Sequence, residues 1–484
     1  MGALFHSPEG GRSASRTGDA NRREPQAVRV VGILFFALAL AFGIGLRAAV
    51  WPPGPSSDET SILQPISDFG ARAIIDSPEA ATNPPLFRFA FALLDDPVRM
   101  YRYGRLLNGM CGLLAQLVVF FTVRRAAPGD MVAAAIAGGV VAVNPTLAVE
   151  SLSFRVYGLL AFVAAVRLAC LCFIAERPSM DWSRPAAILF LICSILLPWL
   201  HYSSIPVLAF EAVALALLLP AHRQLLVAHV AAAALVIPAV LLFLKWRAIL
   251  PPPLPSGSLI SNVTPLWLAG YSDPGTVTLL AMLALILVGC ATAPRQGRAL
   301  LGHVLAWGGA ALTVASYRAI RQGSLSMTVV PLGVALGLLG ASLPRSWKYI
   351  CHAAVGVCFL WSLPSAFRSD LLPIAYPNPD TAAAMAFAAS LRSEPRPLRL
   401  NVYPVWNMGV LQFQLVAAGE ARGWQQCGEV SPSTCSPGQT VQLYGVENLQ
   451  APPPGRLVVL DCYHRPVGCR EQGGSTCAKV YECP

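Results

Sequence analysis

Two neighbouring carboxylates, Asp58 and Glu59, follow the first long apolar run of the chain, in the sequence SSDET. A carboxylate in such a place can take the proton of an attacking hydroxyl or amine. Arginine side chains recur in the polar segments farther along the chain, and arginine can hold a departing phosphate with paired hydrogen bonds. These residue types suit the transfer of a group from a phosphate to a polar acceptor.

The composition of the chain places these residues in a membrane protein. Hydrophobic residues make up 55% of the sequence and charged residues 12%, whereas soluble domains carry about 25% charged residues. The formal charge of +10 is spread over loops without a dense basic run. This pattern argues against nucleic acid as a partner and favours anionic lipids or a phosphate.

Apolar runs of the length that crosses a bilayer predict an all-α polytopic bundle. We expect about eleven transmembrane helices within residues 30–365, followed by a smaller α/β domain. The predicted spans lie near 30–50, 106–123, 131–148, 156–175, 186–200, 204–219, 225–244, 276–292, 299–317, 325–343 and 349–364.

The placement of arginines predicts the orientation of these spans. Residues 1–29 are polar and are expected to form a disordered cytoplasmic N-terminus. The loops that then become cytoplasmic each carry one or two basic residues. An odd number of spans puts the first outer loop, residues 51–105, and the C-terminal residues 366–484 outside the cytoplasm.

Cysteines in the C-terminal residues support an external, disulfide-rich domain. Six cysteines there allow 15 disulfide connectivities, and a zinc site is the competing interpretation. They are Cys427, Cys435, Cys462, Cys469, Cys477 and Cys483. A helix capped near Asp380 and strand-like stretches such as RLVVLDCY predict that this domain is α/β.

Polar clusters in four segments fall on the predicted outer face. Their order resembles the bacterial polyprenyl-phosphate-sugar transferases of the glycosyltransferase C superfamily, such as protein O-mannosyltransferase-like and lipopolysaccharide-core sugar transferase-like enzymes of glycosyltransferase family 39 type. The resemblance rests on the acidic pair, a Pro-Pro-Leu-aromatic element, the arginine of RLLNGMCGLL, an Arg-x-Tyr after NP, and a His-Tyr pair. The residues are Asp58, Glu59, Asn83, Pro84, Pro85, Leu86, Phe87, Arg105, Asn144, Pro145, Arg155, Tyr157, His201 and Tyr202.

The resemblance implies transfer of a sugar, hexose or pentose, from a polyprenyl-phosphate donor to a lipid, glycan or protein acceptor. The reaction would take place on the outer face of the bacterial inner membrane. Asp58 inherits the role of catalytic base or metal ligand, and Glu59 supports it; a divalent metal is left open as the cofactor. Donor phosphate would be bound by Arg155, with Arg105, Arg318 and Arg321 as further candidates. The pocket would be lined by Asn83, Tyr157, His201 and Tyr202.

Each of these residues also has an ordinary structural interpretation. The acidic pair could be a solvated helix cap, and an arginine near the end of a span could extend to the lipid headgroups. Arg167, deep in a span, is expected to face the bundle interior. His229 and His303 are expected to pack or hydrogen-bond within spans. Two other functions stay open: a secondary transporter, which should show charges at the membrane midplane, and a non-catalytic membrane scaffold.

Overall fold

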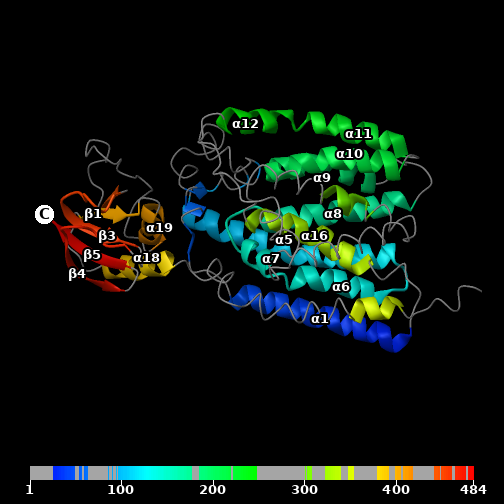
Figure 1. Cartoon of the computed structure of the whole chain (residues 1–484), viewed down its shortest axis with the longest axis horizontal. Coiled ribbons are helices and arrows are strands. Elements are labelled where there is room, and N and C mark those ends of the chain that lie inside the picture. Colours follow the sequence, from blue (N-terminus) through cyan, green and yellow to red (C-terminus); the bar gives the residue numbers. More distant parts are fainter. Residues whose placement is uncertain are drawn as a thin grey trace, which may run out of the picture.

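The structure is a computed structural model of the chain. It describes residues 25–49, 54–56, 59–60, 62–63, 86, 90, 94, 96–176, 185–219, 222–247, 300, 302–307, 322–338, 347–353, 379–391, 398–404, 407–417, 441–446, 448–460, 464–475 and 478–484. These residues form a helical bundle whose long helices run side by side, with a sheet-containing domain beyond one end of it (Figure 1).

The described helices of the bundle lie where the apolar runs predict spans. Its helices are α1 (Gln26–Ala49), α5 (Pro97–Ala126), α6 (Met131–Ala142), α7 (Pro145–Glu150), α8 (Tyr157–Ala175), α9 (Pro185–Leu200), α10 (Ile205–Leu218), α11 (Arg223–Ala234), α12 (Ile237–Arg247) and α16 (Gln322–Leu338). A 3-10 turn, Tyr202–Ser204, joins α9 to α10. In the described part of the chain, four helical segments are long and apolar enough to cross a membrane. The chain is therefore a multi-pass membrane protein. The predicted span near 276–292, and parts of those near 299–317, 325–343 and 349–364, lie outside the described residues.

Capping residues explain where two of the helices begin. Asp96 accepts hydrogen bonds from the backbone of Val98 (2.8 Å) and Arg99 (3.4 Å), and Pro97 occupies the first turn of α5. This cap starts the helix nine residues before the predicted span, so the segment RMYRYGR is helical. In the same way Asn144 accepts from the Leu147 amide at 2.8 Å and starts α7. The span predicted near 131–148 is consequently two helices, α6 and α7.

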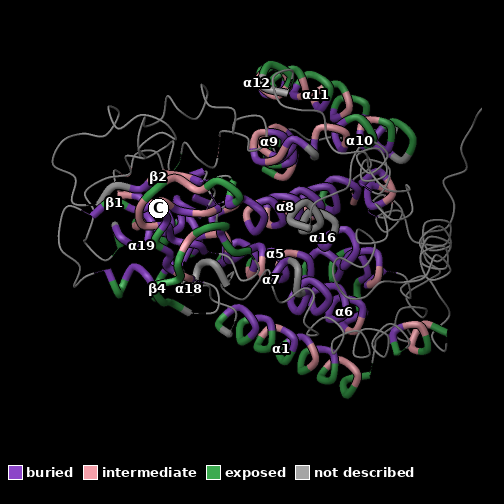
Figure 2. The backbone as a smooth tube through the Cα atoms, turned by 60° about the vertical axis from the view of Figure 1, so that its left-hand side comes forward, coloured by how far each residue is buried: buried purple, intermediate pink, exposed green. Residues whose placement is uncertain are grey.

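Small residues let the helices of the bundle centre approach closely. A Cβ atom at Gly333 of α16 would lie 2.8 Å from the carbonyl oxygen of Ala137 in α6, and one at Gly337 would lie 2.7 Å from that of Ala133. Larger side chains would force these helices apart. The outer helices instead expose apolar side chains, such as Leu38 of α1, as expected for a lipid-facing surface. Exposed positions recur along α1, α10, α11 and α12 (Figure 2).

The described C-terminal residues form a five-stranded mixed sheet with two helices. The elements are α18 (Pro379–Ser390), β1 (Leu398–Tyr403), α19 (Met408–Ala417), β2 (Val441–Gly445), β3 (Gly455–Val459), β4 (Arg470–Ser475) and β5 (Ala478–Cys483). The strand order is β2-β1-β3-β5-β4, with β1 parallel to both its neighbours and β5 antiparallel to β3 and β4. Apolar side chains of β1 and β3 pack with α18 and α19 in one core.

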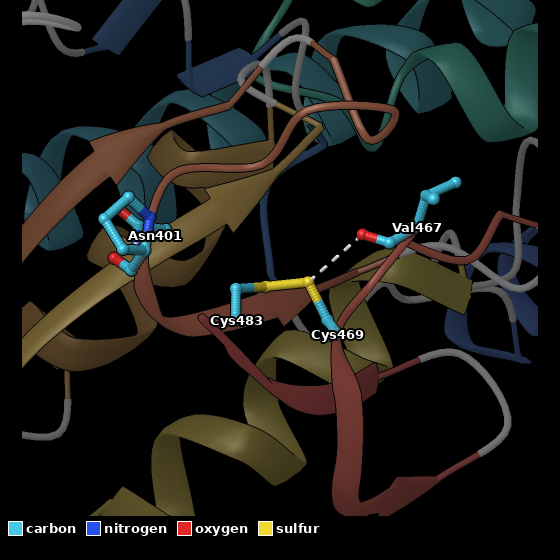
Figure 3. The surroundings of a disulfide bond; sticks show 5 residues. Asn401, Val467, Cys469 and Cys483 are labelled. Carbon is cyan, nitrogen blue, oxygen red and sulfur yellow. Dashed lines mark hydrogen bonds between the residues drawn. A yellow bond between two sulfur atoms is a disulfide. The ribbon is translucent and has the colours of Figure 1, made fainter.

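One disulfide closes the end of this sheet. It joins Cys469, just before β4, to Cys483 in β5, and the Cys469 sulfur lies 3.7 Å from the Val467 carbonyl oxygen (Figure 3). The prediction of a disulfide in the C-terminal residues is thus confirmed for this pair. The other four cysteines of the C-terminal group lie outside the described residues.

Candidate functional site

The turn between α7 and α8, residues 151–156, carries Arg155 and leads into Tyr157. We call it the α7–α8 turn. Side chains from three different parts of the chain hold it in place: α1, the short segment around Glu59, and α5. The turn is therefore the place where sequence-distant parts of the predicted site meet.

Glu59 fixes the acidic segment to this turn. Its side chain is only 4% exposed, and one carboxylate oxygen accepts a hydrogen bond from the backbone amide of Phe154. The other oxygen accepts from the backbone amide of Ser56 (2.7 Å) and from the Ser56 hydroxyl (3.0 Å). Because both oxygens are engaged within the protein, Glu59 is suited to positioning. Its sequence neighbour Asp58 lies outside the described residues.

Arg105 holds the same turn from α5. Its side chain is 2% exposed, and Nε donates to the Leu152 carbonyl oxygen at 2.5 Å. Nη1 donates to the Tyr101 hydroxyl at 2.9 Å, one helical turn earlier. The Tyr101 ring in turn makes an edge contact with Phe413 of α19, with the ring centroids 5.3 Å apart. This chain of contacts connects the C-terminal domain to the turn.

Arg47, at the end of α1, completes the set of buried side chains around the turn. Its Nε donates to the Ser151 hydroxyl at 3.1 Å, and Nη1 donates to the carbonyl oxygens of Gly43 (3.0 Å) and Ala142 (3.3 Å). None of Arg47, Tyr101 and Phe413 was predicted from the sequence as a site residue. The signal available for Arg47 was an arginine at the end of an apolar run, which also fits a side chain that extends to the headgroups.

The predicted pocket residues are divided between two places. Tyr157, at the start of α8, is buried, and its ring centroid lies 5.7 Å from that of His201, which is half-buried. Tyr202 belongs to a separate cluster, since its ring packs 5.1 Å from Phe243 of α12. Arg155 is half-buried in the turn. The remaining candidates, Asn83, Arg318 and Arg321, lie outside the described residues.

A second group of buried polar side chains lies halfway along the bundle. Arg167 of α8 forms an ion pair with Glu211 of α10, and its Nε donates to the Ser194 hydroxyl of α9 at 2.9 Å. Glu211 also accepts from the Trp307 indole at 2.9 Å, and the His303 ring nitrogen lies 3.3 Å from the same carboxylate oxygen. Arg167 faces the bundle interior as the sequence indicates. Sequence alone did not identify its partner, because the two residues are 44 positions apart.

Metal ligands are not gathered in the described part of the chain. No group of three or more His, Cys, Asp or Glu side chains there could hold a metal ion. Both oxygens of Glu59 already accept hydrogen bonds from the protein. We therefore assign no metal ligand among the described residues, and the divalent metal stays a prediction, because Asp58 lies outside them.

Comparison with solved structures gives the fold a known counterpart. The chain matches ArnT from Cupriavidus metallidurans bound to undecaprenyl phosphate with a TM-score of 0.56 and 14% identity, over 93% of this chain and 97% of that one. The apo ArnT of the same organism matches with a TM-score of 0.56 and 15% identity, over 94% and 98% of the two chains.

A third solved structure gives a weaker match, and two sequence comparisons give none. The Archaeoglobus fulgidus oligosaccharyltransferase, in complex with zinc and sulfate, matches with a TM-score of 0.43 and 13% identity, over 78% of this chain and 61% of that one. No protein-family model and no curated protein matches the sequence. The ArnT match extends over nearly the whole of both chains, and we conclude that this protein shares the fold of ArnT.

Proposed function

We propose that this chain is a glycosyltransferase of the bacterial inner membrane that moves a sugar from a polyprenyl-phosphate donor to an acceptor on the outer face. The observation that carries the proposal is the contact between Glu59 and the Phe154 amide. It ties the acidic segment to the turn that bears Arg155. The proposed proton acceptor, Asp58, and the proposed phosphate-binding residue, Arg155, therefore belong to two segments that are in direct contact. The ArnT likeness, over 93% of this chain and with undecaprenyl phosphate bound to that protein, supports the donor class.

In the proposed reaction, an acceptor hydroxyl or amine attacks the anomeric carbon of the sugar. The new bond forms as the bond from that carbon to the phosphate oxygen breaks, and the electron pair of the broken bond leaves with the polyprenyl phosphate. Asp58 takes the proton of the acceptor. Arg155 neutralises the charge that develops on the phosphate. Glu59 holds the segment in place and does not itself exchange the proton.

The first experiment measures donor consumption by the purified protein with a panel of polyprenyl-phosphate sugars. The wild type is compared with Asp58→Asn and with Glu482→Gln, which makes the same carboxylate-to-amide change on an exposed residue of β5. We expect turnover in the wild type and the control and none in Asp58→Asn. Equal turnover in all three would remove Asp58 from the mechanism. A chelator added to the wild type tests for a divalent metal in the same assay.

The orientation of the C-terminal domain belongs to the same proposal. The Cys469–Cys483 disulfide supports an oxidising compartment for residues 366–484. Activity-reporter fusions that work only outside the cytoplasm, placed after Pro484, should be active. Fusions that work only in the cytoplasm should be active when placed before α1. The reverse pattern would put the sheet domain and the proposed site on the cytoplasmic face.

A secondary transporter is the second candidate, and the ion pair between Arg167 and Glu211 favours it. This pair supplies the midplane charge that such a protein should show. Against a transport role, both side chains are already engaged with neighbouring helices through Ser194 and Trp307. Uptake of polyprenyl-phosphate sugars or of free sugars by reconstituted vesicles, without donor cleavage, would identify the transporter.

A further inference from the structure

The α7–α8 turn rests on a buried amide side chain that has no assigned role. Asn108 of α5 is completely buried. Its Nδ2 donates to the carbonyl oxygens of Glu150 and Ser153, each at 3.2 Å, and its Oδ1 accepts from the Leu159 amide at 2.9 Å. One side chain thus satisfies backbone groups before, within and after the turn that carries Arg155.

The surface of α5 around Asn108 is shaped to receive this turn. Gly104 and Gly112 stand one helical turn on either side of Asn108, on the same face. A Cβ atom at Gly104 would lie 2.4 Å from the Phe154 ring, and one at Gly112 would lie 2.7 Å from the Ser151 Cβ atom. The two glycines therefore provide the space that lets the turn approach, and Asn108 between them provides the hydrogen bonds.

The start of α8 approaches the same residue. A Cβ atom at Gly158 would lie 2.1 Å from the Asn108 carbonyl oxygen, so only glycine permits this contact. Tyr157, which precedes Gly158, packs against His201. Contacts with α5 therefore fix the position of the backbone on both sides of Tyr157.

We propose that Asn108 is a positioning residue of the donor-phosphate site: it fixes the backbone of residues 150–159 and thereby the place of Arg155 and Tyr157. The inference rests on the proposed function, because it assigns Arg155 to the donor phosphate. Without Asn108, the Ser153 carbonyl oxygen and the Leu159 amide lose this hydrogen bond. The Glu150 carbonyl oxygen keeps only its bonds from the Ser153 hydroxyl (2.7 Å) and the Ser153 amide (3.3 Å). The turn should then sample other conformations and hold the phosphate less well.

The test combines a structural readout with a binding readout in detergent-purified protein. Hydrogen–deuterium exchange of residues 150–159 reports the turn without any need for activity. The affinity for undecaprenyl phosphate, used without a sugar, reports the phosphate site. The variants are Asn108→Leu and Asn108→Asp, which is nearly isosteric and keeps the acceptor for Leu159 while losing both Nδ2 donors.

A matched control comes from the same helix. Thr122→Val removes one part-buried hydrogen bond of α5, from the Thr122 hydroxyl to the Val118 carbonyl oxygen (2.7 Å), without touching the turn. We expect exchange in residues 150–159 to rise and the Kd for undecaprenyl phosphate to rise at least about tenfold, or about 1.4 kcal/mol, in both Asn108 variants. Thr122→Val should match the wild type in both measurements.

The two readouts separate the ways in which the inference can fail. Unchanged exchange in a folded Asn108→Asp protein would show that Asn108 does not fix the turn. Faster exchange with unchanged affinity would show that the turn does not set the phosphate site. A wild type that does not bind undecaprenyl phosphate would overturn the proposed function and with it the link to phosphate, whereas the exchange data would still report whether Asn108 holds the turn.

Discussion

Replacement of Glu59 by glutamine should loosen the α7–α8 turn without a change in side-chain size. The carboxylate accepts from the Phe154 amide through one oxygen and from Ser56 through the other. An amide has one oxygen and one NH₂ group, and the NH₂ group cannot accept. Whichever way the glutamine side chain is turned, its NH₂ group faces the backbone N–H of either Phe154 or Ser56, and two donors cannot pair.

The magnitude follows from these contacts. A buried donor that loses its acceptor costs about 1–3 kcal/mol, and hydrogen bonds to a charged acceptor are the stronger kind. With about 2 kcal/mol lost, the population of the locally opened turn rises about 30-fold, since about 1.4 kcal/mol corresponds to a factor of ten. Hydrogen–deuterium exchange of a peptide that contains Phe154 measures this population when opening is local and reversible.

The control for this prediction is Glu482→Gln, which should leave exchange at Phe154 unchanged. Donor turnover by Glu59→Gln should fall, because the opened turn is inactive. The fall is at most about 30-fold, the factor by which the opened population rises. Turnover should stay above that of Asp58→Asn. If Glu59→Gln is as inactive as Asp58→Asn while exchange at Phe154 is unchanged, the positioning role is wrong and Glu59 takes part in the chemistry.

Three further predictions concern other parts of the molecule. Phe413→Ala removes the ring that packs on Tyr101 and should cost about 3–5 kcal/mol; limited proteolysis should then release the C-terminal sheet faster, and an unchanged rate would contradict the contact. Glu211→Leu leaves the Arg167 charge buried without its partner and should destabilise the protein by about 3–5 kcal/mol. Adding Arg167→Met should recover part of the lost thermal stability, and strictly additive losses would refute the pairing. Reduction of the Cys469–Cys483 disulfide, which closes a separation of 14 residues, should lower the stability of the sheet domain by about 3 kcal/mol, and an unchanged unfolding curve with reductant would count against it.

The sequence by itself determined the class of the protein and most of its helices. Apolar runs of bilayer length predict where α1, α8 and α9 lie, because a helix in lipid must be apolar over its whole length. The order of the polar clusters also predicted a helical membrane bundle of the glycosyltransferase C type, and the likeness to ArnT agrees with that prediction at the level of the fold. Local signals that were present but less clear, such as Asp96 before Pro97 and Asn144 before Pro145, set the actual helix starts.

The tertiary structure decided which of the candidate residues act on one another. Glu59 and Phe154 are 95 positions apart, and Arg105 and Leu152 are 47 apart, so no periodicity in the sequence relates them. Burial also decided the role of Glu59, because a carboxylate whose two oxygens both accept hydrogen bonds inside the protein can position a site but has little freedom to exchange a proton. Asn108 shows the same limit: its spacing from Gly104 and Gly112 was visible in the sequence, but its hydrogen bonds to the turn exist only once α5 and α8 have packed together.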